Sequence, residues 1–253
     1  MRILVTRPLP EGAEVAKGLR QAGYRPLLSP VLEIRLLPPT FVQGTFDAIL
    51  VTSARAFLAD WVPGLLAKHA GIPVYAAGSN TTSAARQLER AAGRTESRVV
   101  CLSDDARGLA AMLAPRPPSR FLYLAGRDRK PHVETLLSNA GHCVVATETY
   151  AALAATQFNA GTLTAFRAGE IDAVMHYSRR SAEIFLDLAK NANLTEKALH
   201  LQHYCISADT AEPLLAIGAL HLQVAAKPDE SSLFAMIPPP DRMARSDSLA
   251  QKS

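Results

Sequence analysis

The sequence of 253 residues predicts an α/β protein built from two similar domains with parallel β-sheets. Three observations carry this prediction. Short apolar runs alternate with segments of helical spacing, the chain repeats itself internally, and the connections between the repeated blocks differ in length. Hydrophobic residues make up 48% of the chain and charged residues 20%, which is enough apolar surface to bury the cores of such a fold.

The apolar runs have the length and composition of buried parallel strands. The segments between them carry apolar residues at helical spacing, such as Val15, Leu19 and Ala22. The predicted strands are Ile3–Thr6, Pro26–Val31, Ala48–Thr52, Val74–Ala77, Val99–Leu102, Phe121–Ala125, Cys143–Ala146, Ala173–Tyr177, Tyr204–Ile206 and Leu222–Ala225.

The internal repeat has the order A, B, A′, B′. Block A begins with Ile3-Leu4-Val5-Thr6-Arg7, and block A′ with Tyr123-Leu124-Ala125-Gly126-Arg127. Block B begins with Asp47-Ala48-Ile49-Leu50-Val51-Thr52-Ser53-Ala54-Arg55, and block B′ with Asp172-Ala173-Val174-Met175-His176-Tyr177-Ser178-Arg179-Arg180. Within the B blocks, residues 74–81 match residues 203–210. An arginine therefore follows the first strand of both A blocks, and a Ser-x-Arg pair follows the first strand of both B blocks.

The lengths of the connections indicate how the blocks pair. Only residues 114–120 separate B from A′, whereas residues 35–46 separate A from B and residues 151–171 separate A′ from B′. The sequence therefore predicts a continuous domain at 38–150 and a discontinuous domain at 1–35 plus 152–237. Each would hold a five-stranded parallel sheet of the flavodoxin-like type. The composition of 238–253 predicts a disordered tail.

Charge and composition exclude several function classes. The net charge of +4 and the pI near 9.1 favour an acidic ligand, but the arginines are scattered and aromatic residues are only 6%, which argues against nucleic acid. No apolar run reaches the roughly 18 residues of a membrane helix, so we expect no membrane partner and a cytoplasmic location. The three cysteines, Cys101, Cys143 and Cys205, are expected to be reduced core residues.

The sequence contains no motif for a common cofactor. It has no G-x-G-x-x-G, no G-x-x-x-x-G-K-[ST], no G-x-S-x-G and no H-E-x-x-H. His200 and His203 form a pair without carboxylates nearby, which favours a surface or packing role for both. We therefore expect neither a cofactor nor a metal.

Polar residues instead gather where predicted strands end and helices begin, which is the ligand edge of a doubly wound sheet. Taken singly, Ser53, Thr81, Ser178 and Thr210 fit helix N-caps. Taken together with arginines, they form a set of carboxylate or phosphate sites, because free helix N–H groups and guanidinium groups both bind anions. The arginines of this set are Arg7, Arg55, Arg127 and Arg180.

The chain from residue 1 to about 237 resembles the uroporphyrinogen-III synthase family. The resemblance rests on Leu4-Val5-Thr6-Arg7-Pro8, Thr52-Ser53-Ala54-Arg55-Ala56, Gly78 to Thr81, Thr149-Tyr150 and the loops at Ser178 and Thr210. It implies two α/β domains, one of them discontinuous, joined by a two-stranded linker with the active site between them. It also implies closure of linear hydroxymethylbilane to uroporphyrinogen III with inversion of ring D and loss of water, without metal or cofactor.

The resemblance also assigns site residues. Tyr150 matches the family's tyrosine near the linker and becomes the candidate for hydrogen bonding the departing hydroxyl; its alternative role is packing at the hinge. Ser53, Thr81, Ser178 and Thr210 match positions that hold acetate or propionate groups. The chain departs from the family at Asp209, whose carboxylate would repel a polycarboxylate unless it points away, caps the helix or accepts from a pyrrole N–H.

Two alternatives stay open at this point. A non-catalytic tetrapyrrole-binding or regulatory module would keep the fold without the activity. A relative of two-domain periplasmic-type receptors would explain a hinge, but not the A, B, A′, B′ order. We expect a monomer that makes transient contact with the enzyme supplying hydroxymethylbilane.

Overall fold

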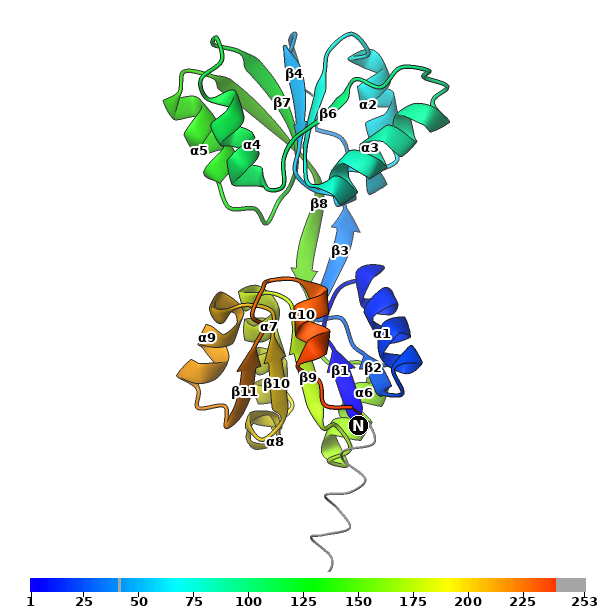
Figure 1. Cartoon of the computed structure of the whole chain (residues 1–253), viewed down its shortest axis with the longest axis vertical. Coiled ribbons are helices and arrows are strands. Elements are labelled where there is room, and N and C mark those ends of the chain that lie inside the picture. The colour runs from blue at the N-terminus through cyan, green and yellow to red at the C-terminus, as the bar shows by residue number, and fades with distance from the viewer. Residues whose placement is uncertain (41, 240–253) are drawn as a thin grey trace, which may run out of the picture. The chain divides into compact units, whose positions relative to one another are not determined.

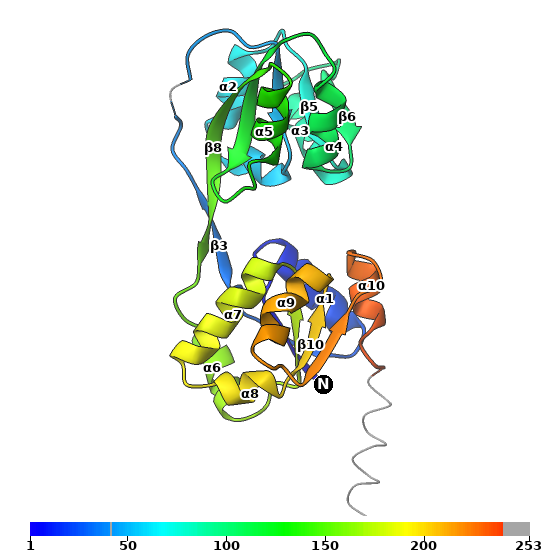
Figure 2. The same cartoon turned by 90° about the vertical axis from the view of Figure 1, so that its left-hand side faces the viewer.

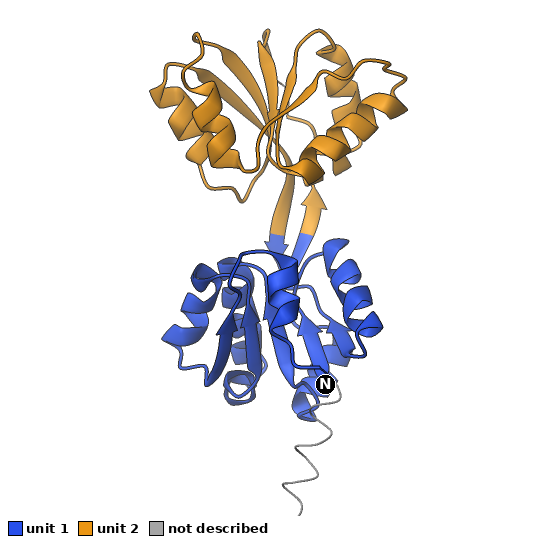
Figure 3. Ribbon diagram, viewed as in Figure 1, with its two compact units in different colours: residues 1–33, 153–253 blue, residues 34–152 orange. Residues whose placement is uncertain are grey.

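A computed structural model describes residues 1–40 and 42–239 of the chain. It divides into two compact units (Figure 3). Unit 1 comprises Met1–Glu33 and the chain from Leu153 onward, and unit 2 comprises Ile34–Ala152. The chain passes from one unit to the other twice, within the strands β3 (Leu32–Leu36) and β8 (Cys143–Ala154). The predicted tail at 238–253 lies, from residue 240 on, outside the described residues.

Unit 1 contains a five-stranded parallel sheet in the order β11-β10-β9-β1-β2, with helices on both of its faces (Figure 1). Helices α1 and α10 cover one face, where Val15 and Leu233 pack on Ile3 and Val5. Helices α6, α7 and α9 cover the other face. The elements are β1 (Arg2–Val5), α1 (Glu11–Gln21), β2 (Arg25–Leu28), α6 (Ala160–Arg167), β9 (Ala173–His176), α7 (Arg179–Asn191), α8 (Thr195–Leu199), β10 (Gln202–Cys205), α9 (Ala208–Ala216), β11 (His221–Val224) and α10 (Glu230–Ala235).

Unit 2 contains a six-stranded sheet in the order β3-β8-β7-β4-β5-β6. The 3₁₀ helix η1 and helices α2 and α3 cover one face, and α4 and α5 cover the other (Figures 1 and 2). Alternate residues of β4 serve the two cores, because Ile49 and Val51 face α2 while Leu50 faces α4. The elements not yet given are β4 (Ala48–Val51), η1 (Ala54–Leu58), α2 (Val62–Lys68), β5 (Val74–Ala77), α3 (Ser79–Ala91), β6 (Val99–Ser103), α4 (Ala106–Leu113), β7 (Arg120–Gly126) and α5 (His132–Asn139).

The structure confirms the α/β class and sheets that are mainly parallel, but it corrects the strand count of unit 2, where the added strand β3 runs antiparallel to β8 (Figure 1). Every predicted strand is present, and β3 is an additional one, so the sheet of unit 2 has six strands among the described residues. Its sequence, Leu32-Glu33-Ile34-Arg35-Leu36, alternates apolar and charged residues, which is the pattern of a half-exposed strand. Strand β8 also continues well beyond the predicted end at Ala146.

The register of the strands corrects the alignment of the A blocks. Arg2 pairs with Arg25 in β2, while Arg120 pairs with Cys143 in β8. On the opposite side of each strand, Asp172 N donates to Arg2 O and Asp47 N donates to Arg120 O, so Arg2 and Arg120 also have equivalent partners there. Arg120 therefore corresponds to Arg2, and block A′ is displaced by two residues from the predicted alignment. Arg127 lies two residues beyond the position of Arg7, so these two arginines are not equivalent in the structure.

The cysteines only partly follow the prediction. Cys205 is buried in unit 1, and burial raises the pKa of its thiol to about 12. Cys101 and Cys143 are exposed. The prediction of three core cysteines was wrong because Cys101 lies on the edge strand β6 and Cys143 begins β8, where an apolar run does not guarantee cover on both faces.

The core of unit 1 holds a pair of buried histidines, His176 on β9 and His203 on β10. His203 Nε2 lies 2.9 Å from the carbonyl of Ala198, which can only accept, so this nitrogen carries the proton. His203 Nδ1 is then the acceptor for His176 Nε2–H at 3.1 Å. Burial lowers the pKa of both rings, that of His203 to about 4. Both side chains are thus neutral in the folded protein at neutral pH.

Candidate functional site

Four neighbouring strands of unit 2 bring predicted site residues to one edge of the sheet. Thr52, Ser53 and Arg55 follow β4, Thr81 follows β5, and Arg127 follows β7. Tyr150 lies on β8 beside the end of β7. Because parallel strands end at the same edge, these residues gather at the carboxyl edge of the order β8-β7-β4-β5.

Tyr150 packs on the end of the neighbouring strand. It lies in register with Gly126, after a shift in the pairing between Ala125 and Gly126. Its carbonyl accepts from Arg127 N at 2.8 Å, and its half-buried side chain lies over Gly126. The phenol therefore sits at the carboxyl edge of the sheet, at the point where the pairing of β7 with β8 ends.

A second tyrosine, Tyr123 on β7, lies close to Tyr150. The hydroxyls of Tyr123 and Thr52 lie 2.7 Å apart and share a hydrogen bond. Burial raises the pKa of Tyr123, the hydrogen bond to Thr52 partly offsets that shift, and nearby Tyr150 contributes the smallest effect. Tyr123 was missed by sequence reasoning because it lies within a buried strand run, where an aromatic residue ordinarily packs.

Two arginines follow β7, and both form ion pairs within unit 2. Arg127 Nε lies 2.9 Å from Glu148 Oε2, and both side chains are substantially exposed. Arg129 donates to Glu134 Oε1 at 2.6 Å and to the carbonyl of Gly126 at 2.9 Å. Arg129 is thus held more firmly than Arg127, although sequence reasoning singled out only Arg127.

Ser53 and Thr81 occupy different positions at their helix starts. Ser53 is the N-cap of η1, and its Oγ accepts from Arg55 N at 3.3 Å. Thr81 is the third residue of α3 and is buried; the N-cap is Gly78, at φ 82°. The N-cap prediction for Thr81 was wrong because Gly78 turns the chain directly after β5, so α3 begins one turn earlier than predicted.

In unit 1, Arg7 makes its contacts at the carboxyl edge. Its Nη1 lies 2.6 Å from Glu230 Oε2, at the start of α10. Its guanidinium carbon lies 4.7 Å from the centre of the Tyr177 ring. Burial and the carboxylate of Glu230 raise the pKa of Tyr177, while Arg7 acts in the opposite direction. Nothing in the sequence separates Glu230 from other surface carboxylates, so this partner was missed.

The loops after β9 and β10 place the remaining predicted residues. Ser178 is the N-cap of α7 and accepts from Ser181 N at 3.1 Å, and Arg180 lies in the first turn of that helix. Thr210 is the buried third residue of α9, and Ser207 is its N-cap. The N-cap prediction for Thr210 was therefore also wrong, and Ser207 was missed.

Asp209 lies in the first turn of α9, where it is exposed and 3.7 Å from Arg179 Nη1. Arg179 also pairs with Glu183 and Glu212. The carboxylate of Asp209 is thus partly neutralised by a neighbour, and it does not cap the helix.

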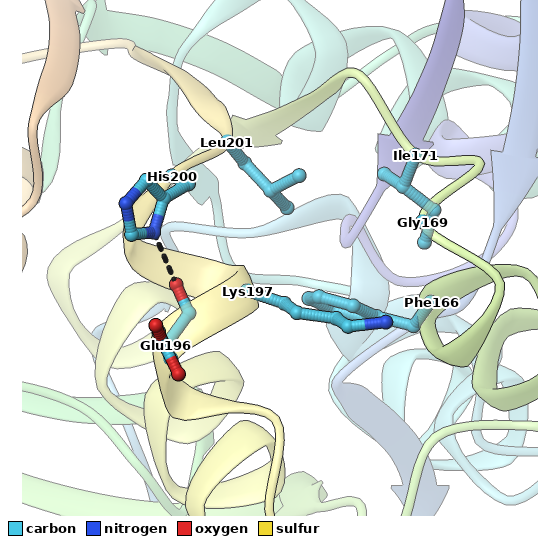
Figure 4. Close-up of a pocket in the computed structure, with 7 residues that line it drawn as sticks. All are labelled: Phe166, Gly169, Ile171, Glu196, Lys197, His200 and Leu201. Carbon is cyan, nitrogen blue, oxygen red and sulfur yellow. Dashed lines mark hydrogen bonds between the residues drawn. The ribbon is translucent and has the colours of Figure 1, made fainter.

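A separate pocket of about 440 Å³ lies in unit 1 among α6, α8 and the starts of β9 and β10 (Figure 4). Phe166, Ile171 and Leu201 line its apolar side, and Glu196, Lys197 and His200 its polar side. Since Ile171 and Leu201 precede their strands, the pocket lies at the amino edge of the sheet. None of the predicted site residues lines it.

Two kinds of feature are absent from the part of the chain that the structure describes. No helix of residues 1–40 and 42–239 is long and apolar enough to cross a membrane. Over the same residues, no group of three or more His, Cys, Asp or Glu side chains is placed to hold a metal ion.

Comparison with known proteins connects this arrangement to one family. The family model described as uroporphyrinogen-III synthase HemD matches residues 13–235. A search of curated proteins gave no significant match. The chain is similar to the crystal structure of uroporphyrinogen-III synthetase from Helicobacter pylori 26695, with a TM-score of 0.63 and 19% identity over 93% of this chain and 98% of that one.

The chain is also similar in fold to a mutant uroporphyrinogen III synthase from the extremely thermophilic bacterium Thermus thermophilus. Here the TM-score is 0.54 and the identity 18%, over 97% of this chain and 99% of that one. Because the family model spans most of the sequence, the chain belongs to the uroporphyrinogen-III synthase family.

Proposed function

We propose that this chain closes linear hydroxymethylbilane to uroporphyrinogen III, with inversion of ring D and loss of water. The observation that carries the proposal is the family match over residues 13–235. The polar carboxyl edges of the two sheets and the net charge of +4 suit a substrate that bears many carboxylates.

The chemistry asks little of individual side chains. Departure of the hydroxyl, protonated as water, leaves an azafulvene cation, and the last pyrrole attacks at its own substituted carbon. The resulting spiro intermediate fragments and closes again with ring D inverted. Spontaneous closure competes and gives the symmetric isomer, so the main task of the protein is to hold the linear chain in one reactive conformation.

Tyr150 is the proposed hydrogen-bond donor to the departing hydroxyl. The phenol is half-buried at the carboxyl edge of unit 2, which leaves it within reach of a ligand. The electron-rich pyrrole already drives the departure, so a positioned donor supplies only part of the reduction in the barrier.

The proposed carboxylate-binding residues are of two kinds. Ser53, Ser178 and the backbone N–H groups of the helix starts that also carry Thr81 and Thr210 offer hydrogen bonds. Arg7, Arg55, Arg127 and Arg180 supply charge. Arg7 and Arg127 each already hold a carboxylate of the protein, Glu230 and Glu148, and a substrate carboxylate would take the place of that group.

We further propose that residues 1–35 with 152–237 and residues 38–150 are two domains, and that the protein is a cytoplasmic monomer. It would receive its unstable substrate through transient contact with the enzyme that makes it. Exposed Leu215, Ile217, Leu220 and Val224 are the feature most at odds with a monomer. Light scattering over a range of protein concentrations decides the point, since a mass near 27.1 kDa is expected throughout.

The direct test is incubation of the purified chain with hydroxymethylbilane, followed by oxidation and isomer analysis of the porphyrin formed. The proposal expects mainly the inverted isomer. A non-catalytic binding module would leave the symmetric isomer dominant, and that result would overturn the proposal.

A further inference from the structure

Strand β7 and strand β8 form a longer pair than their counterparts in unit 1. The pair β1–β2 ends with Val5 opposite Leu28. Tyr123 opposite Ala146 holds the corresponding place in unit 2, but pairing continues there through Leu124, Ala125 and Gly126. Gly126 and Tyr150 lie opposite each other at the end of this extension. The extension therefore carries a glycine and a tyrosine for which unit 1 has no counterpart.

The tyrosine ring occupies the space where a side chain at position 126 would stand. A β-carbon on Gly126 would lie 2.7 Å from Cζ of Tyr150 and 2.9 Å from both Cε2 and Oη. Protein atoms do not approach a β-carbon so closely, so any side chain at 126 forces the ring to move. The backbone of Gly126 does not have a positive φ, so this contact, and not backbone strain, is what requires a glycine.

The backbone gives the ring little freedom to retreat. Arg127 N donates to Tyr150 O at 2.8 Å, and Thr149 Oγ1 donates to Ala125 O at 3.3 Å. The pairing shift between Ala125 and Gly126 brings Tyr150, and not Thr149, opposite the glycine. A side chain at 126 therefore displaces the phenol by rotating the ring and leaves the strand in place.

We infer that Gly126 is a positioning residue that sets where the phenol of Tyr150 lies. The inference rests on the proposed function, because it matters for catalysis only if Tyr150 donates to the departing hydroxyl. Displacing the phenol of Tyr150 lowers kcat, because a hydrogen-bond donor acts only from the right position. It leaves the substrate-binding groups unchanged, because these lie on other loops.

The experiment compares Gly126→Ala with Gly64→Ala. Gly64 lies in α2 of the same unit, and a β-carbon there meets nothing within 4 Å. Gly126→Ala is expected to lower kcat on the order of 10- to 100-fold with little change in KM, and Gly64→Ala to behave as the wild type. In a Tyr150→Phe background, Gly126→Ala should cause no further loss of kcat, since the hydroxyl it misplaces is already gone. Wild-type kcat in Gly126→Ala, or the same loss in both backgrounds, would overturn the inference.

Two readouts separate this inference from the proposed function. NMR of protein labelled at the tyrosine ring carbons, with Tyr150 assigned by Tyr150→Phe, should show a shifted Tyr150 resonance in Gly126→Ala but not in Gly64→Ala, whatever the activity. If Gly126→Ala fails to fold, Gly126→Ala/Tyr150→Leu should fold as well as Tyr150→Leu alone. Failure of that double variant would make Gly126 a structural residue and overturn the inference. Absence of the inverted isomer with wild-type protein would instead count against the proposed function.

Discussion

The two units begin their sheets in the same way and differ at the edge where the strands end. In both, the first residue of the strand that opens the A block, β1 or β7, donates its N–H to an aspartate, Asp172 for Arg2 and Asp47 for Arg120. Beyond this shared start, unit 1 places Tyr177 beneath Arg7, whereas unit 2 extends its strands and sets Tyr150 on Gly126. The repeat therefore supplies the scaffold, and the residues that each copy adds to it supply the chemistry.

The units also differ inside their cores. The B-block alignment places Val51 and Val74 of unit 2 where unit 1 has His176 and His203. Both valines are fully buried in an apolar cluster. The histidines form a neutral hydrogen-bonded pair, and His176 Nδ1 has no hydrogen-bond partner among the described residues. Unit 1 therefore carries a titratable core, and unit 2 does not at these positions.

The largest expected effect comes from removing the two phenols in turn. Tyr150→Phe should keep the fold and substrate binding but lower kcat by roughly ten- to ten-thousand-fold, the range from a positioned donor to full acid catalysis. Tyr177→Phe is the matched variant in unit 1 and should leave kcat close to the wild type. Steady-state kinetics on both variants measures this difference. Equal losses of kcat would show that the phenols of the two units contribute alike to the reaction.

Acid should distinguish the two cores. The histidine pKa values are lower in the folded state than the ordinary value near 6.5, so the unfolded chain binds more protons and stability falls as the pH drops below about 6.5. The folded pKa of His203 is about 4, so this residue alone should lower the free energy of unfolding by about 3 kcal/mol between pH 7 and pH 4. Denaturant unfolding between pH 7 and pH 4 measures it.

The double variant His176→Val/His203→Val copies unit 2 into unit 1 and is the control for the acid experiment. It should flatten the pH dependence. The single variant His203→Val leaves the N–H of His176 unpaired and should cost about 1 to 3 kcal/mol at pH 7. An unchanged pH profile in the double variant would show that other groups carry the acid sensitivity.

The two strand-end arginines should differ more modestly. Arg7 is 28% exposed and Arg127 is 55% exposed, so solvent screens a carboxylate at Arg127 more strongly. Arg7→Ala should raise KM by an amount that corresponds to about 1 to 3 kcal/mol, and Arg127→Ala by less. An unchanged KM in both variants would show that Arg7 and Arg127 bind only the protein's own carboxylates, Glu230 and Glu148, and not the substrate.

The smallest effect is expected at Asp209. Its carboxylate is 62% exposed and shares Arg179 with two glutamates. Asp209→Asn should leave the denaturation midpoint unchanged, because an exposed pair in a network keeps its other members. A clear fall in KM with this variant would mean that the carboxylate repels the substrate.

Sequence reasoning predicted most of the scaffold and about half of the edge. Buried strands appear in a sequence as apolar runs, and the ten strands of this kind were predicted. Strand β3 was missed because it alternates apolar and charged residues. The caps after β5 and β10 were assigned one turn too late. The cap after β5 is Gly78, which has no capping side chain, and after β10 serine fits the cap pattern as well as threonine does. Glu230 and Gly126 carry no local signal, since their roles depend on contacts with residues distant in the chain.

In the proposed mechanism, the protein sets the conformation of the substrate, and the phenol of Tyr150 only assists the departure of the hydroxyl. The most direct measurement is the isomer composition of the product made by Tyr150→Phe, taken at enzyme concentrations high enough to outrun spontaneous closure. This mechanism requires that the inverted isomer still predominates, although the rate is lower. A switch to the symmetric isomer would contradict it, because Tyr150 would then orient ring D.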